Sequence, residues 1–268
     1  MKFSLKTLAA AVAMASAAGG ASAAIDNGAG GNGELFFNIW DANGSYSRDL
    51  NISIDSFESL IAAPGDFHLT FNADTLLGNF FTGSSAAGTR TGAFKFNLVA
   101  NDNSGARRLL SSFTEPAPLT TNTSTTIRTG TSATSTHIGF INSAMGANDS
   151  VAVNNSSSAW TGKAAFKDTV GGAINFSNAG GVTNNTFASG LSFMRIDAAS
   201  TGSSASIYNQ YLDIGAFGNS EVHVYFDANK ALHIQSIAVV PEPESYAMLL
   251  AGLGMLGFMA RRRLNNRV

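Results

Sequence analysis

The stretch ELFFNIWDANGSYSRDLNISI, residues 34–54, decides our interpretation of the fold. Its first seven residues are rich in aromatic and branched side chains, which favour a β-strand. Residues 41–44 have the composition of a turn, because Asp, Asn and Gly tolerate tight backbone bends. After the turn, Leu50, Ile52 and Ile54 alternate with polar residues, and this period of two indicates a half-buried strand. We therefore predict a β-hairpin over residues 34–54.

Short segments with strand composition continue through the rest of the chain. Residues 54–63 predict a short helix, the Thr- and Ser-rich stretch 114–136 predicts extended structure or a long loop, and 143–158 predicts a loop with at most one helical turn. Many short strands without a long helical period indicate an all-β fold, and we predict a single β-sandwich or jelly-roll-like domain over 34–239. The Gly-rich residues 24–33 before it predict a flexible lead-in. The other predicted strands cover residues 67–71, 92–100, 138–141, 160–166, 173–176, 191–196, 207–217, 221–226 and 231–237.

Residues 1–23 have the three parts of a secretory signal peptide. A short basic segment, Met1 to Lys6, is followed by an apolar stretch from Thr7 to Ala18. Ala21 and Ala23 then supply the small-x-small pattern of a cleavage site. We predict cleavage after Ala23, which implies the secretion translocon and signal peptidase as partners.

The last part of the sequence combines a stiff acidic segment, an apolar run and a basic end. Proline fixes φ and lacks a backbone donor, so the segment Val240, Pro241, Glu242 and Pro243 is expected to be extended and exposed. Residues 246–260 carry no charge. As a helix they would span about 22 Å, short of the roughly 30 Å core of a bilayer. We predict a short transmembrane helix there, because cations follow it in the position of a membrane anchor stop: Arg261, Arg262 and Arg263.

This arrangement predicts a cytoplasmic tail at residues 264–268. A buried core helix is the alternative for the apolar run, since its length also suits a protein interior. Three consecutive arginines at its end favour the membrane interpretation over the core helix.

The order and spacing of these features resemble the PEP-CTERM sorting signal of Gram-negative bacteria, over residues 240–263. Glu244 departs from the family pattern, in which a small residue commonly follows the Pro-Glu-Pro triplet. The resemblance implies cutting near the triplet by an exosortase, a multi-spanning membrane transpeptidase. It also implies a precursor anchored in the inner membrane that is then delivered to the cell surface or an extracellular matrix.

Composition excludes several function classes. Between Ala24 and Val239 the chain carries ten Lys and Arg against 16 Asp and Glu, a net charge of −6. Nucleic-acid binding requires a basic face, and the sequence predicts none. The chain has no cysteine, which excludes thiol catalysis, cysteine-type zinc sites and covalent haem attachment.

The sequence contains no assembled set of catalytic or metal-binding residues. His223 and His233 lie on the two arms of the last predicted hairpin and could face each other. A zinc site needs three or four ligands, so we favour ordinary strand histidines over a metal site. The oxygen-rich turns at Asp41, Asp102 and Asp227 lack the full calcium loop, and Asx turns explain their composition. We therefore predict a protein that is not an enzyme and that has no cofactor, although a carboxylate pair assembled by folding stays open.

The sequence is compatible with three functions. The leading hypothesis is a non-catalytic structural or adhesive component of an exopolysaccharide or biofilm matrix, with extracellular polysaccharide as its partner. The second is a carbohydrate-binding or carbohydrate-active protein that stacks sugars on Trp40 or Trp160, although we favour a core position for both rings. The third is ice binding or adhesion through Thr-rich strands at 121–136, a stretch that lacks a regular T-x-T register.

Overall fold

A computed structural model describes residues 24–63, 66–90, 93–105, 107–113, 122–162, 169–170, 174–175, 180–183, 191–197, 207–208, 212–213 and 220–238. By its internal contacts the chain divides into one unit that ends at Ile237 and a second unit that begins at Ala238. Everything described below belongs to the first unit, apart from the final residue of its last strand.

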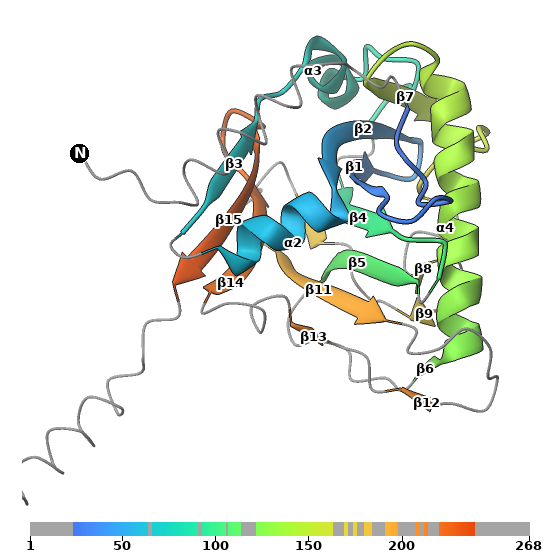
Figure 1. The fold of residues 1–268 in the computed structure, drawn as a ribbon. Coiled ribbons are helices and arrows are strands. Elements are labelled where there is room, and N and C mark those ends of the chain that lie inside the picture. Colours follow the sequence, from blue (N-terminus) through green and yellow to red (C-terminus); the bar gives the residue numbers. More distant parts are fainter. Residues whose placement is uncertain are drawn as a thin grey trace, which may run out of the picture. The chain divides into compact units, whose positions relative to one another are not determined.

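One large antiparallel sheet organises the described residues, and three helices accompany it (Figure 1). The neighbouring strands run in the order β3-β15-β14-β11-β5-β4-β1-β2-β7, with β10 added beside β4 and β13 beside β11. The helices are α2 (Ile54–Ala62), α3 (Thr75–Thr82) and α4 (Ser124–Met145). The strands of this sheet are β1 (Glu34–Trp40), β2 (Gly44–Ser53), β3 (His68–Phe71), β4 (Ala93–Asn101), β5 (Arg108–Phe113), β7 (Ser150–Asn154), β10 (Gly180–Thr183), β11 (Leu191–Asp197), β13 (Leu212–Asp213), β14 (Ser220–Phe226) and β15 (Leu232–Ala238). Two short pairs lie apart from it: β6 (Asn122–Thr123) with β12 (Ile207–Tyr208), and β8 (Thr169–Val170) with β9 (Ile174–Asn175).

The sheet curls around an apolar core. Strands β1 and β14 are separated by three others in the sheet order, which in a flat sheet would place them about 19 Å apart. The rings of Phe37 on β1 and Phe226 on β14 nevertheless lie 5.1 Å apart between centroids, edge to face. The same Phe226 ring lies 5.2 Å from Phe96 on β4. These contacts require the sheet to bend back on itself and enclose its inner face.

Helices α2 and α3 cover the inner face. Helix α2 begins at the N-cap Ser53 and buries Ile54, Phe57, Leu60 and Ile61. The Phe57 ring lies 5.3 Å from Phe193 of β11, in a T-shaped pair. Burying each such ring contributes about 1.5–3 kcal/mol, so α2 is held mainly by its apolar side.

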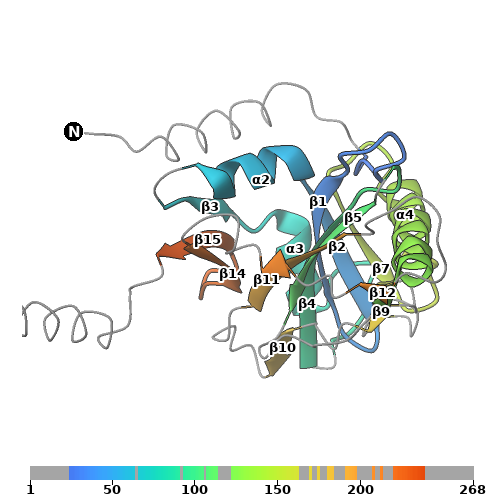
Figure 2. The same ribbon diagram turned by 60° about the horizontal axis from the view of Figure 1, so that its bottom comes forward.

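Helix α4 covers the outer face, and α2 and α4 therefore lie on opposite sides of the sheet (Figure 2). Along β1, Leu35, Phe37 and Ile39 enter the inner core, while Phe36 packs in the outer core with residues of α4. A strand directs successive side chains to opposite faces, so β1 is buried on both. The outer core contains Ile25, Phe36, Val99, Leu109, Ile127, Ile138, Ile141, Met145, Val151 and Ala159.

The prediction of extended structure or a long loop for 114–136 is wrong from Ser124 onward, and the predicted strand at 138–141 is wrong as well, because both stretches belong to α4. Ile138, Ile141 and Met145 follow a spacing of three and four residues and are all buried in the outer core. The hydroxyls of Thr129 and Thr134 donate to the carbonyls four residues earlier, at 2.9 Å, and are therefore satisfied within the helix. Burial on the sheet outweighs the low helix propensity of Thr and Ser.

The N-terminal described segment is packed, although we predicted a flexible lead-in for 24–33. Ile25 is buried, its N–H donates to Asn142 Oδ1 at 3.0 Å, and Asn142 Nδ2 donates back to the Ile25 carbonyl at 2.9 Å. At Gly28, with φ of 68°, a Cβ would lie 2.1 Å from the carbonyl oxygen of Asn101. Gly28 thus permits close packing against β4, while Ile25 fixes the segment to α4.

The mostly-β class is confirmed, as are the hairpin β1–β2, helix α2, strands β3, β4 and β11, and the final strands β14 and β15. The two-sheet sandwich or jelly roll is not confirmed, because the long described strands form a single curled sheet. Sequence reasoning missed α3, β5 and β7. It also placed a strand at 160–166, where residues 160–162 form no strand.

Candidate functional site

The predicted processing and sorting residues lie outside the described part of the chain. They are Ala21 and Ala23 at the signal cleavage site, the segment Val240, Pro241, Glu242 and Pro243, and the anchor residues Arg261, Arg262 and Arg263. The predicted helix at 246–260 also lies outside it and stays a prediction. Across the residues that the structure does describe, none of the helices has the length and apolarity needed to cross a bilayer.

The two tryptophans differ in their suitability as stacking platforms for sugars. Trp40 is buried in β1 with 3% of its surface exposed, which excludes it as a platform. Trp160 is half-buried, and its Nε1 donates to the Asp41 carbonyl at 3.3 Å. A Cβ on Gly162 would lie 2.4 Å from the Trp160 ring, so the backbone packs against it. The core position that we favoured is confirmed for Trp40 and holds in part for Trp160.

A histidine that the sequence did not single out, His68 of β3, lies against His233. His68 Nε2 and His233 Nδ1 are 2.8 Å apart, and the Tyr225 ring stacks on His233 at 4.8 Å. His233 Nε2 lies 3.3 Å from Asp227 Oδ2. Partial burial, together with His233, lowers the pKa of His68 below its ordinary value. Within the described ranges, no group of three or more His, Asp or Glu is placed so that it could hold a metal ion.

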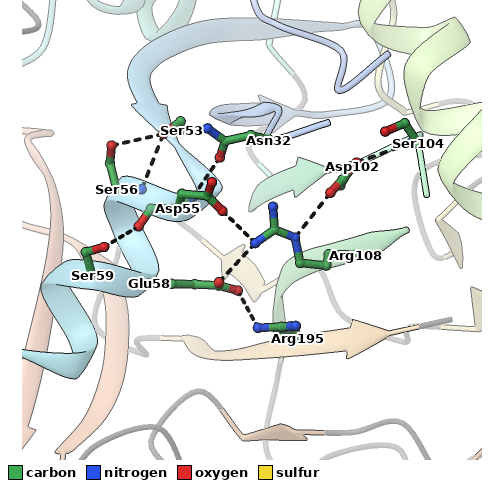
Figure 3. A network of polar contacts seen from close by, with 10 residues as sticks. All are labelled: Asn32, Ser53, Asp55, Ser56, Glu58, Ser59, Asp102, Ser104, Arg108 and Arg195. Atoms are coloured by element: carbon green, nitrogen blue, oxygen red, sulfur yellow. Dashed lines mark hydrogen bonds and ion pairs between the residues drawn. The ribbon is translucent and has the colours of Figure 1, made fainter. Parts of the chain in front are cut away.

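A network of charges joins α2 to the sheet (Figure 3). Arg108 of β5 contacts Asp55 at 2.7 Å, Glu58 at 3.1 Å and Asp102 at 3.2 Å. Arg195 of β11 contacts the other oxygen of Glu58 at 2.8 Å. Each of the three carboxylates therefore faces a guanidinium, and the network fastens the polar side of α2 over β5 and β11.

A second group of arginines lines a surface cleft of about 480 Å³, which we name the arginine cleft. Arg107 reaches it from the residue before β5, and Arg128 from the second turn of α4. The other lining residues come from α4 and are mostly hydroxyl-bearing: Ser124, Thr125, Thr129, Ser132, Ala133 and Thr136. The sequence did not indicate this cleft, because Arg128 lies within a stretch that we predicted to be extended structure or a long loop.

The comparisons with known proteins concern the end of the chain. No curated protein and no solved structure matches the sequence. A family model described as the PEP-CTERM protein-sorting motif matches residues 239–263, which include the predicted triplet segment and the three arginines. The motif implies an exported protein that is targeted to an exosortase and sorted to the cell envelope or surface. The resemblance found in the sequence is thereby confirmed, and this chain carries a PEP-CTERM protein-sorting motif at residues 239–263.

Proposed function

We propose that this protein is a non-catalytic structural or adhesive component of an extracellular polysaccharide or biofilm matrix. The observation that carries the proposal is the sorting motif at residues 239–263, since it directs the protein to a membrane transpeptidase and to the cell exterior. In this proposal, residues 246–260 anchor the precursor in the inner membrane, and cutting near Pro241–Pro243 releases the β body.

The positions of the two tryptophans weaken the alternative of a carbohydrate-binding or carbohydrate-active protein that stacks sugars on these rings. Trp40 is in the interior, and the ring of Trp160 is half-buried against Gly162. Ice binding through flat Thr-rich strands loses its basis, because the stretch from Ser124 is helical.

Processing is tested by expressing the full chain in hosts with and without an exosortase and following the C-terminal peptide by mass spectrometry. We expect the arginine-containing tail to be lost only where exosortase is present. Glu242→Ala within the triplet should retain the tail, whereas Glu244→Ala, which removes the same charge two residues later, should be processed normally. Equal retention of the tail in both hosts would overturn the sorting step.

The matrix role is tested in the native host by separating cells, medium and extracellular polysaccharide. We expect the processed protein in the polysaccharide fraction, and its release when that polysaccharide is digested. Recovery of the processed protein entirely in the medium, with no loss of matrix cohesion in a deletion strain, contradicts the role.

A further inference from the structure

We propose that His68 and His233 form an open binding site for a transition-metal ion of the Cu²⁺ and Ni²⁺ class. Imidazole is a preferred ligand of these ions. Among the described residues, no three His, Asp or Glu are grouped so that they could hold a metal ion, so the pair supplies two ligands and water supplies the rest. The pair lies on strands β3 and β15, outside the sorting motif, and its chemistry is therefore independent of the proposed function.

The register of the sheet brings three donor atoms to one place. Strands β3 and β15 pair so that Thr70 is opposite His233, and His68 is two residues away from Thr70 on the same strand. The Nε2 atom of His68 lies 2.8 Å from Nδ1 of His233, and the hydroxyl oxygen of Thr70 lies 3.2 Å from the same nitrogen. His68 and Thr70 are exposed, so an ion in solution can reach these atoms.

The ring of His233 is held in the orientation that a metal ligand needs. Its Nε2 lies 3.3 Å from Asp227 Oδ2, and the other oxygen of Asp227 accepts from the backbone N–H of Ala231 at 2.8 Å. The Tyr225 ring stacks on the imidazole at 4.8 Å, with 13° between the planes. The carboxylate favours a hydrogen on Nε2, which leaves the lone pair of Nδ1 facing His68. Metal-binding histidines typically direct their second nitrogen to a carboxylate in this way.

The distance between the two nitrogens indicates the class of ion. With metal–nitrogen bonds of about 2.0–2.1 Å, two neighbouring ligands at 90° lie about 2.9 Å apart, whereas tetrahedral ligands lie about 3.4 Å apart. The observed 2.8 Å matches the first arrangement. Tetragonal geometry is typical of Cu²⁺ and Ni²⁺, while Zn²⁺ prefers a tetrahedron.

The ion would replace the hydrogen that the two imidazoles share. Burial, together with His233, lowers the pKa of His68, so its ring is neutral at pH 7, the form that binds metals. On binding, both rings turn so that their lone pairs point at the ion. The hydrogen on Nε2 of His68 passes through water to Nδ1 of the same ring, so the number of protons is unchanged.

The test uses the full-length chain, purified without a histidine tag and freed of metal with a chelator. Cu²⁺, Ni²⁺ and Mg²⁺ are titrated by calorimetry, and the Cu²⁺ complex is examined by electron paramagnetic resonance. The test variant is His68→Gln, because His68 is exposed and its loss should leave the fold intact. The matched control is His223→Gln, since His223 is half-buried on β14 and no group of three that includes it could hold a metal ion. Thermal unfolding without metal checks the fold of each variant.

We expect saturable binding of Cu²⁺ and Ni²⁺, no binding of Mg²⁺, and a resonance signal with coupling to two imidazole nitrogens. Cu²⁺ should raise the unfolding temperature, because it binds the folded pair. His68→Gln should weaken Cu²⁺ binding by about tenfold or more and abolish the coupling to the second nitrogen, and His223→Gln should do neither.

A pair that only joins β3 to β15 by a hydrogen bond would give a different result. Loss of stability in His68→Gln, without saturable Cu²⁺ binding by the unmodified chain, overturns the metal site. Equal Cu²⁺ affinity of His68→Gln and the unmodified chain, or an equal loss of affinity in His223→Gln, overturns it as well. None of these measurements depends on export, so failure of sorting or of matrix association would refute the proposed function alone.

Discussion

Both faces of the sheet bury an apolar core, and the outer face buries a group of polar side chains as well. On the inner face, Phe37 packs in the apolar core, with its ring against those of Tyr46 and Phe226. On the outer face, the next residue, Asn38, is fully buried in a hydrogen-bonded group: its Nδ2 donates to Asn97 Oδ1 at 2.9 Å, and its Oδ1 accepts from Ser47 at 2.6 Å and from Thr161 at 3.3 Å. One strand thus joins an apolar core to a polar layer beneath α4. Burial alone therefore does not determine how much a residue contributes to stability, because a buried polar side chain also needs hydrogen-bond partners.

The largest effect is expected on the inner face. Phe37→Ala should lower the free energy of unfolding by about 3–5 kcal/mol, because it removes a buried ring and leaves a cavity against Phe226. Urea unfolding monitored by circular dichroism measures the change. Phe140→Ala is the control, since Phe140 is 46% exposed on α4, and its loss should cost less than about 0.5 kcal/mol. Similar losses for both variants would contradict the apolar core described for β1.

A buried carboxyl distinguishes the outer face by its response to pH. Burial raises the pKa of Asp49 to about 7, and its Oδ2 has no hydrogen-bond partner in the described residues. The folded state therefore keeps a proton that the unfolded chain, with an ordinary pKa near 3.9, has released. Stability should fall as pH rises from about 4 to about 7, by at most about 4 kcal/mol, and should then level off.

Asp49→Asn should remove this pH dependence and raise stability at pH 8, as measured by urea unfolding across the pH range. Asp66→Asn, which changes an exposed carboxylate, provides the comparison and should leave the dependence in place. If Asp49→Asn is as pH-sensitive between pH 4 and 7 as the unmodified chain, another group is responsible.

Several elements of the fold could be predicted from local sequence. The elements and contacts that were missed depend on residues far apart in the chain. The hairpin β1–β2 and helix α2 could be predicted because each is formed by residues that follow one another in the sequence and show clear hydrophobic periodicity and turn composition. The pair of His68 and His233 is formed by strands 165 residues apart in the sequence, so no local pattern indicates it. Helix α4 was missed because Thr and Ser have low helix propensity, while the burial of Ile138 and Ile141 becomes visible only once the sheet exists.

The polar layer itself is tested by a smaller change. Asn38→Ala should lower the free energy of unfolding by about 1–3 kcal/mol, because the amide of Asn97 and the hydroxyl of Thr161 each lose a hydrogen bond. A double-mutant cycle with Asn97→Ala should give a coupling energy of at least about 0.5 kcal/mol, since the two residues are paired across β1 and β4. Additive effects of the two substitutions would show that the hydrogen bond contributes nothing.

The smallest expected effect concerns the helix that covers the polar layer. Thr129 is exposed on α4, and its hydroxyl donates only to the Thr125 carbonyl of its own helix among the contacts described. In a helix, Thr129→Ala should raise stability by up to about 0.7 kcal/mol, because alanine has the highest helix propensity. In an extended segment the same change should be neutral or destabilising, since threonine favours strands. Thermal unfolding of Thr129→Ala beside Thr70→Ala, an exposed threonine of strand β3, distinguishes the two conformations by the sign of the difference. A loss of stability in both variants would contradict the helical assignment of this Thr-rich stretch. It would then also contradict the packing of α4 over the outer face.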